Sequence, residues 1–85
     1  MISLRDMTDM IYVYDAYCAI NRALFGEAVF FGFSDGNWGT MTRMFNVIER
    51  NVADELKKDN FKEAKAILDS SLLTPEERAR KLLGE

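Results

Sequence analysis

The chain has 85 residues, of which 48% are hydrophobic, and a net charge of −3 at pH 7. These totals indicate one folded domain rather than a disordered segment, and they lack the basic excess that binding to a nucleic-acid backbone normally requires. The sequence has no histidine and a single cysteine, Cys18, which excludes histidine-dependent catalysis, thiolate zinc clusters and an intrachain disulfide.

A domain of this size buries only about 60–65% of the surface that its unfolded chain exposes, so we expect self-association to support its stability. The N-terminal residues show no basic region followed by an apolar run, and no apolar run reaches the ~18–20 residues of a membrane span. We therefore expect a cytoplasmic protein without a signal peptide.

The first predicted element is a long helix from about Leu4 to Phe25. Ser3 and Asp6 provide a hydroxyl and a carboxylate at its start, and Gly26 suits its end. Its apolar residues at helical spacing are Leu4, Met7, Met10, Ile11, Tyr14, Cys18 and Phe25, with Val13, Tyr17, Ile20 and Leu24 widening the stripe. This stripe is too wide for a lone surface helix, so we expect the helix at the centre of the fold or in a dimer interface.

Residues 28–39 concentrate aromatic side chains and glycines, namely Phe30, Phe31, Phe33 and Trp38 with Gly32, Gly36 and Gly39. We predict an irregular loop over 28–33 with at most a few extended residues, and a turn at 34–37. Such a segment either closes one end of the core or forms a surface for a partner, and the sequence leaves both interpretations open.

A second long helix is predicted from about Trp38 or Thr40 to Lys58, before a break at Asp59 and Asn60. Its inner residues would be Met41, Met44, Phe45, Ile48, Val52 and Leu56. We expect it to pack antiparallel to the first helix.

Two short helices complete the prediction. Asn60 and Glu63 form a capping signature for a helix that ends near Asp69, with Phe61, Ala64, Ile67 and Leu68 on its inner side. The run 74–77, Thr-Pro-Glu-Glu, is the strongest start signal in the chain, for a helix that buries Ala79, Leu82 and Leu83 and stops at Gly84. The sequence therefore predicts an all-α single domain over residues 1–85, a small four-helix arrangement of two long helices and a short C-terminal pair.

The sequence provides no motif for nucleotide or metal chemistry. It lacks a Gly-x-x-x-x-Gly-Lys phosphate loop and a Gly-x-Gly-x-x-Gly fingerprint, and Asp35 and Asn37 match only two positions of a calcium loop. We therefore predict a protein that is not an enzyme and that holds no cofactor and no metal.

The predicted binding surface combines Phe31 and Trp38 with Met41 and Met44, because aromatic and methionine side chains together make adaptable contact surfaces. We expect the chain to act by binding another protein, as a stoichiometric regulator or inhibitor of the kind that phages and mobile elements encode, and to form a homodimer. The alternative is a nucleic-acid accessory protein that uses Lys62, Lys65, Arg78, Arg80 and Lys81. Residues 57–85 hold seven Lys and Arg against six Asp and Glu, so a mixed-charge solvated face is the interpretation that we prefer there.

Overall fold

The computed structural model describes residues 2–25 and 35–85, and within these residues the chain is all-α with no strand. This confirms the predicted fold class, including two long helices and a short C-terminal helical pair. The elements are α1 (Leu4–Phe25), α2 (Asp35–Asn51), a 3₁₀-helix η1 (Asp54–Lys57), α3 (Lys62–Leu68) and α4 (Pro75–Leu83).

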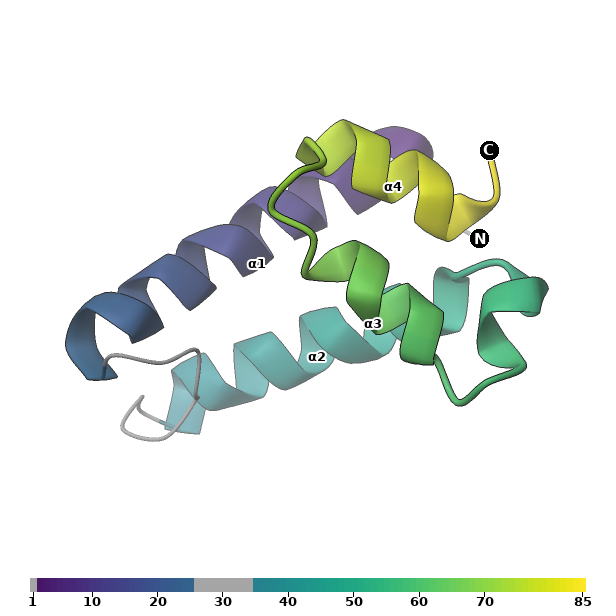
Figure 1. Ribbon diagram of the computed structural model, residues 1–85. Helices are drawn as coiled ribbons and strands as arrows, with labels where there is room; N and C mark the ends of the chain where they lie inside the picture. Colours follow the sequence, from purple (N-terminus) through teal and green to yellow (C-terminus); the bar gives the residue numbers. More distant parts are fainter. Residues whose placement is uncertain (1, 26–34) are drawn as a thin grey trace.

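The helices form a small bundle in which α1 and α2 run in opposite directions, as predicted (Figure 1). Helix α4 lies along the N-terminal half of α1, and α3 lies between α4 and α2. The short pair α3 and α4 therefore covers only one end of the two long helices, and the C-terminal half of α1 extends beyond it.

The core lies where α4, α3 and η1 meet the inner sides of the long helices. Met7, Ile11, Ala79 and Leu82 are all 0% exposed. The other buried hydrophobic residues are Tyr14, Ile48, Val52, Leu56, Ala64 and Leu68. Leu83, which we predicted to be buried, is half-buried against this cluster.

The bounds of α1 confirm the sequence prediction. The Ser3 hydroxyl accepts a hydrogen bond from the amide of Asp6 at 3.1 Å, and the Ser3 carbonyl accepts one from the amide of Met7 at 3.0 Å. These bonds satisfy amides that an α-helix leaves without an internal partner in its first turn. The predicted stop at Gly26 and the predicted loop over 28–33 lie outside the described residues.

Helix α2 differs from the prediction at both ends. It starts at Asp35, so residues 35–37, which we read as part of a turn, belong to its first turn. Asp, Gly and Asn favour helix starts as well as turns, which explains the error.

The same helix ends at Asn51 instead of continuing to Lys58. The backbone becomes extended at Ala53, with a ψ of 144°. The Ala53 amide donates a 2.8 Å hydrogen bond to the carbonyl of Leu82 in α4. Val52 and Leu56 are nevertheless buried, at 2% and 8% exposure. The apolar spacing of the sequence therefore runs past the end of α2, because η1 also directs Leu56 toward the core.

The predicted capping signature at Asn60 and Glu63 is wrong. Helix α3 has Phe61 at its N-cap, with no hydrogen bond from a capping side chain. Asn60 and Phe61 are both left-handed, with φ of 59° and 62°. A left-handed backbone is costly for a bulky side chain, so packing of Phe61 against the core outweighs the local capping preference.

The start and end of α4 confirm the strongest local signal in the sequence. The Thr74 hydroxyl accepts from the Glu77 amide at 3.1 Å, and the Glu77 carboxylate accepts from the Thr74 amide at 2.9 Å. The Thr74 hydrogen bonds lower the pKa of Glu77, which keeps this carboxylate charged in the positive first turn. At the other end Gly84 takes a φ of 81°, a left-handed conformation that suits glycine.

Candidate protein-binding surface

Of the four residues that we predicted to bind a partner, the structure places Met44. It is half-buried and packs against the core from α2. Trp38 and Met41 lie in the first turns of α2, but their side chains, like the whole of Phe31, fall outside the described part of the structure. The structure therefore does not show whether these four side chains form one surface.

A different apolar surface is exposed on the middle turns of α1. Tyr12 is 60% exposed, Val13 44% and Ile20 49%, and the exposed Ala16 lies between them. These residues and the half-buried Tyr17 surround a shallow hollow of about 360 Å³. We refer to Tyr12, Val13, Ala16, Tyr17 and Ile20 as the outer face of α1.

The outer face follows from the helical period. At 100° per residue, Val13, Ala16 and Ile20 project from the side of α1 roughly opposite to Met7 and Ile11, which are fully buried. Between residues 12 and 20, α1 is therefore apolar on two sides, and the bundle covers one of them. The exposed Asp9, one turn before Val13, bounds the outer apolar side. Sequence analysis counted Val13 and Ile20 as part of one wide stripe; the missed signal was that they point away from the centre of that stripe.

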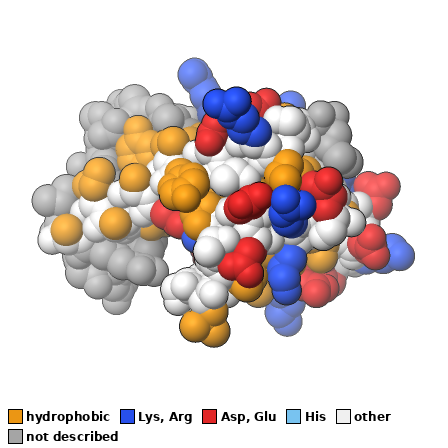
Figure 2. Space-filling view, turned by 90° about the horizontal axis from the view of Figure 1, so that it is seen from above, with side chains coloured by type: hydrophobic (Ala, Val, Ile, Leu, Met, Phe, Trp, Pro, Cys, Tyr) orange, Lys and Arg blue, Asp and Glu red, His pale blue; other side chains and the backbone are white. Residues whose placement is uncertain are grey.

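Figure 2 shows how side chains are distributed on the upper side of the molecule. Hydrophobic side chains gather over the C-terminal half of α1, whereas positive and negative side chains alternate over the other half, toward the chain termini. The two ends of the bundle thus present different surfaces.

Between these surfaces a polar cluster joins α1 to α4. Arg78 is 5% exposed and makes a paired contact with Asp15, with nitrogen–oxygen distances of 2.9 and 2.6 Å. It also donates to the carbonyls of Leu68 and Leu73 at 2.9 and 3.1 Å. The hydrogen bonds to Asp15 raise the pKa of Arg78 against the opposing effect of burial. Arg78 therefore serves as a link between elements, and sequence analysis missed it because its partner lies 63 positions away.

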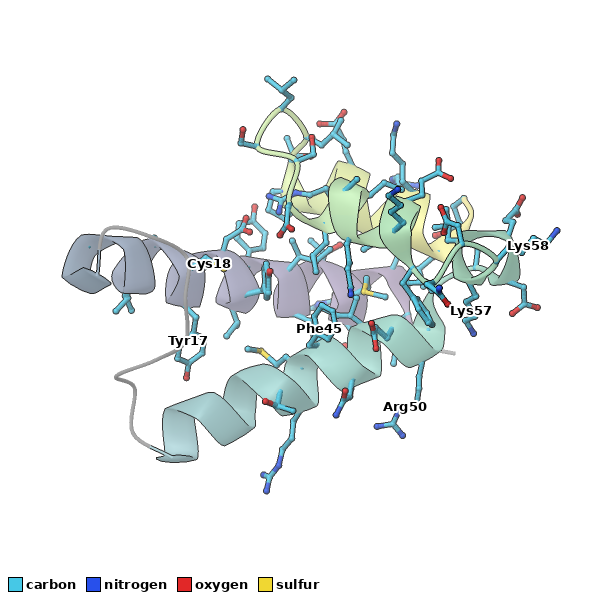
Figure 3. The ribbon with its side chains drawn as sticks, turned by 60° about the horizontal axis from the view of Figure 1, so that its bottom comes forward. Tyr17, Cys18, Phe45, Arg50, Lys57 and Lys58 are labelled. Atoms are coloured by element: carbon cyan, nitrogen blue, oxygen red, sulfur yellow. The ribbon has the colours of Figure 1, made fainter. Side chains whose placement is uncertain are left out.

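A second contact in the cluster joins α1 to the end of α3. The Tyr14 hydroxyl donates to the Asp69 carboxylate at 3.1 Å. Burial, with smaller effects of Cys18 and Asp69, raises the pKa of Tyr14 well above its ordinary value. The phenol therefore stays protonated and remains a donor. In Figure 3, Cys18 lies on the side of α1 that faces this cluster, and Tyr17 points toward α2.

The basic residues of the predicted nucleic-acid surface do not act alike. Arg78 is buried, which corrects its assignment to that surface. Arg80 is exposed and pairs with Glu76 at 3.1 Å, and Lys65 lies 5.7 Å from the centre of the Phe45 ring. Lys62 and Lys81 are exposed. The positive charges at this end of the bundle are thus partly engaged within the chain.

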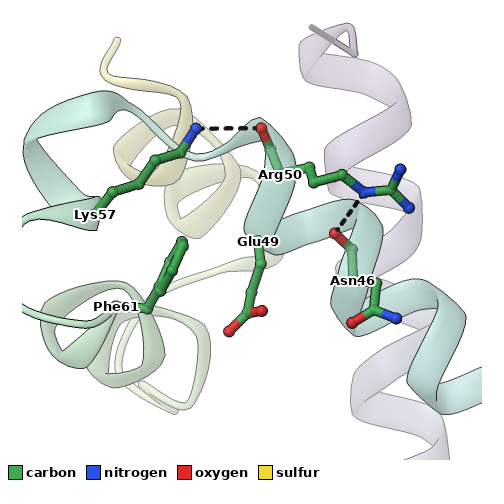
Figure 4. Close-up of a pocket in the computed structure, with 5 residues that line it drawn as sticks. All are labelled: Asn46, Glu49, Arg50, Lys57 and Phe61. Carbon is green, nitrogen blue, oxygen red and sulfur yellow. Dashed lines mark hydrogen bonds between the residues drawn. The ribbon is translucent and has the colours of Figure 1, made fainter.

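A further hollow, of about 380 Å³, lies between α2 and the turn before α3 (Figure 4). Its lining residues are Asn46, Glu49, Arg50, Lys57 and Phe61. The Lys57 ammonium donates to the Arg50 carbonyl at 3.4 Å, and the Arg50 side chain donates to the Asn46 carbonyl at the same distance. In the figure the Arg50 guanidinium points away from the Phe61 ring. The Lys57 contact satisfies a carbonyl at the C-terminal end of α2, where the last carbonyls lack helical partners, and the Arg50 contact lies within α2.

Within the described residues, no three Cys, Asp or Glu side chains come together in a way that could hold a metal ion. None of the helices there is both long and apolar enough to cross a membrane. Comparisons with protein-family models, curated proteins and solved structures find no match for the chain.

Proposed function

We propose that this chain is a non-enzymatic protein-binding module, a stoichiometric regulator or inhibitor, and that it binds through the outer face of α1. The observation behind the proposal is that one helix has two apolar sides and the bundle covers one. A helix that is apolar on all sides is normally buried, so an uncovered side of this kind is typical of a contact surface.

The chemical character of the outer face supports protein contact. It offers the exposed Tyr12 and, at its edge toward α2, the half-buried Tyr17, together with aliphatic side chains around a small central residue. Tyrosine combines an apolar ring with a polar tip, which suits protein contacts. None of its five residues is charged, so covering them requires no desolvation of an ion. Phe31, Trp38, Met41 and Met44 remain proposed contributors from the other long helix and the segment before it.

The test is capture of a partner by the tagged chain from the cells that naturally make it. We expect Ile20→Glu to abolish capture while leaving the helical circular dichroism unchanged, because Ile20 is half-exposed. The matched control is Leu72→Glu, which places the same charge on a 93% exposed leucine in the turn between α3 and α4. Equal capture by both variants would contradict the proposal.

The predicted aromatic and methionine surface has its own test. Trp38→Ala should weaken capture without unfolding the chain if Trp38 contacts the partner. Unfolding of this variant would instead assign Trp38 to the core.

A further inference from the structure

We infer that the outer face of α1 binds an amphipathic helix of another protein, one whose apolar stripe is bordered by lysine or arginine side chains. The inference rests on the proposed function, because it names the chemistry of the partner that covers the same face. The charges that border the face carry the argument.

The apolar part of the face is a row along one helix. Val13, Ala16 and Ile20 follow one another at spacings of three and four residues, so a facing helix can run along them. The shallow hollow of about 360 Å³ that Ala16 helps to line leaves room for an apolar side chain of that helix. Hydrophobic residues at the same spacing on the partner, the apolar stripe of an amphipathic helix, therefore match the row.

The first acidic border lies at the N-terminal end of the row. Asp9 is one turn before Val13, and Asp6 is three residues before Asp9, so both continue the line of the row. Both aspartates are exposed, and neither forms an ion pair among the described residues. From residue 6 to residue 20 every charged residue of α1 is an aspartate, and the arginines of the helix, Arg5 and Arg22, lie beyond the two ends of this stretch.

The second acidic border lies along the side of the face. Asp15 is three residues after Tyr12, and it lines a hollow of about 350 Å³ together with Asp69 and Ala19. The Asp15 side chain stays 40% exposed although it pairs with Arg78, and Asp69 is exposed. Two carboxylates and one guanidinium line this hollow, and a carboxylate can accept several hydrogen bonds at once. A basic side chain of the partner can therefore bind there while the Arg78 link stays in place.

The sign of these charges distinguishes between possible partners. A second copy of the chain would bring the same aspartates to the contact, and a nucleic acid would bring phosphates, so both would meet like charges. A helix with lysine or arginine beside its apolar stripe meets opposite charges instead. The exposed cations of the neighbouring α4 do not neutralise the borders, because Arg80 pairs with Glu76 and Lys81 acts on Glu77 of the same helix.

The size of the face sets the expected affinity. The row from Asp6 to Ile20 covers ~21 Å of one helix, which provides less contact than the ~800 Å² per partner of a standard interface. We therefore expect a dissociation constant in roughly the micromolar range or weaker. It should rise with salt, because exposed border charges are screened.

The experiment is a nuclear magnetic resonance titration of the ¹⁵N-labelled full chain with two synthetic helical peptides of ~18 residues. Both carry the same leucine stripe, bordered by lysine in one peptide and by glutamate in the other. We expect the lysine peptide to shift the amide signals of residues 9–20 and to bind about tenfold or more tightly than the glutamate peptide. Asp9→Lys should weaken binding of the lysine peptide by about threefold or more, and Ile20→Glu should abolish the shifts. The matched control is Glu63→Lys, which makes the same charge change at an exposed position on α3 and should stay within about twofold of the wild type.

Equal binding of the two peptides, or equal losses in Asp9→Lys and Glu63→Lys, would overturn the inference. A dimer of the chain in sedimentation equilibrium that Ile20→Glu dissociates would also overturn it, since a second copy would then cover the face. A chain that binds neither peptide but captures a natural partner in an Ile20-dependent manner refutes the inference and leaves the proposed function standing. Natural capture that Ile20→Glu leaves intact refutes the proposed function itself, so the two failures are distinguishable.

Discussion

The two apolar sides of α1 both carry aliphatic and tyrosine side chains, but their surroundings are opposite. The inner side, with Met7 and Ile11, is fully covered by the rest of the bundle, whereas Val13 and Ile20 on the outer face remain half-exposed. The two isoleucines, nine positions apart, show the contrast most clearly. The spacing of hydrophobic residues predicts which side chains favour burial, and the folded arrangement shows which of them are buried.

The sharpest way to test this comparison is to truncate both isoleucines. Ile11→Ala should lower the free energy of unfolding by about 2–5 kcal/mol, since it removes a fully buried side chain and leaves a cavity. Ile20→Ala should change it by less than about 0.5 kcal/mol in dilute solution. Urea denaturation followed by circular dichroism measures both values, and equal losses would contradict the assignment of the two sides.

The next largest effect is expected where the polar cluster holds α4 on α1. Arg78→Met should cost about 2–3 kcal/mol, because it leaves the Leu68 and Leu73 carbonyls without their donor and Asp15 without its ion pair. The Asp15 side chain is 40% exposed, and water moderates the loss. Thermal unfolding of Arg78→Met beside Arg80→Met, which alters an exposed pair, measures the difference. Similar melting temperatures for the two variants would refute a linking role for Arg78.

Tyr14 offers a smaller effect with a pH dependence. Because burial raises the folded-state pKa of Tyr14 above the ordinary value of about 10, ionisation opposes folding. The stability that Tyr14 provides is complete below pH ~10 and is lost as the pH rises further toward the folded-state pKa. Tyr14→Phe should cost about 0.5–1.5 kcal/mol at neutral pH through loss of the hydrogen bond to Asp69, and it should lessen the decline above pH 10. Parallel alkaline curves for the two proteins would show that Tyr14 does not titrate in this way.

The smallest expected effect concerns the charged end of the bundle. With Arg78 buried and Arg80 paired to Glu76, we expect no salt-dependent mobility shift of short DNA or RNA duplexes at low ionic strength. A shift that Lys62→Gln and Lys81→Gln weaken would revive the nucleic-acid alternative.

Local signals predicted the parts of the fold that local contacts determine. The bounds of α1 and the capping box of α4 depend on residues within a few positions of each other, such as Ser3 with Asp6 and Thr74 with Glu77. The end of α2 depends instead on a hydrogen bond from Ala53 to Leu82, and periodicity gives no sign of it.

The candidate site was predicted less well for the same reason. Sequence analysis expected either a central helix or a dimer interface for α1, and the structure shows a helix whose inner side is central and whose outer face is uncovered. The pairing of Arg78 with Asp15 spans most of the chain, so no local pattern indicated that this arginine belongs to the interior.

The most direct test of the central claim is partner capture by a chain that carries a charge at the middle of the outer face. Ala16→Glu should abolish capture of the partner while the circular dichroism stays unchanged, because Ala16 is exposed between Tyr12, Val13 and Ile20. Ser71→Glu, at an exposed position in the turn before α4, serves as the control and should capture the partner as the wild type does. Equal capture by the two variants would contradict binding through the outer face of α1.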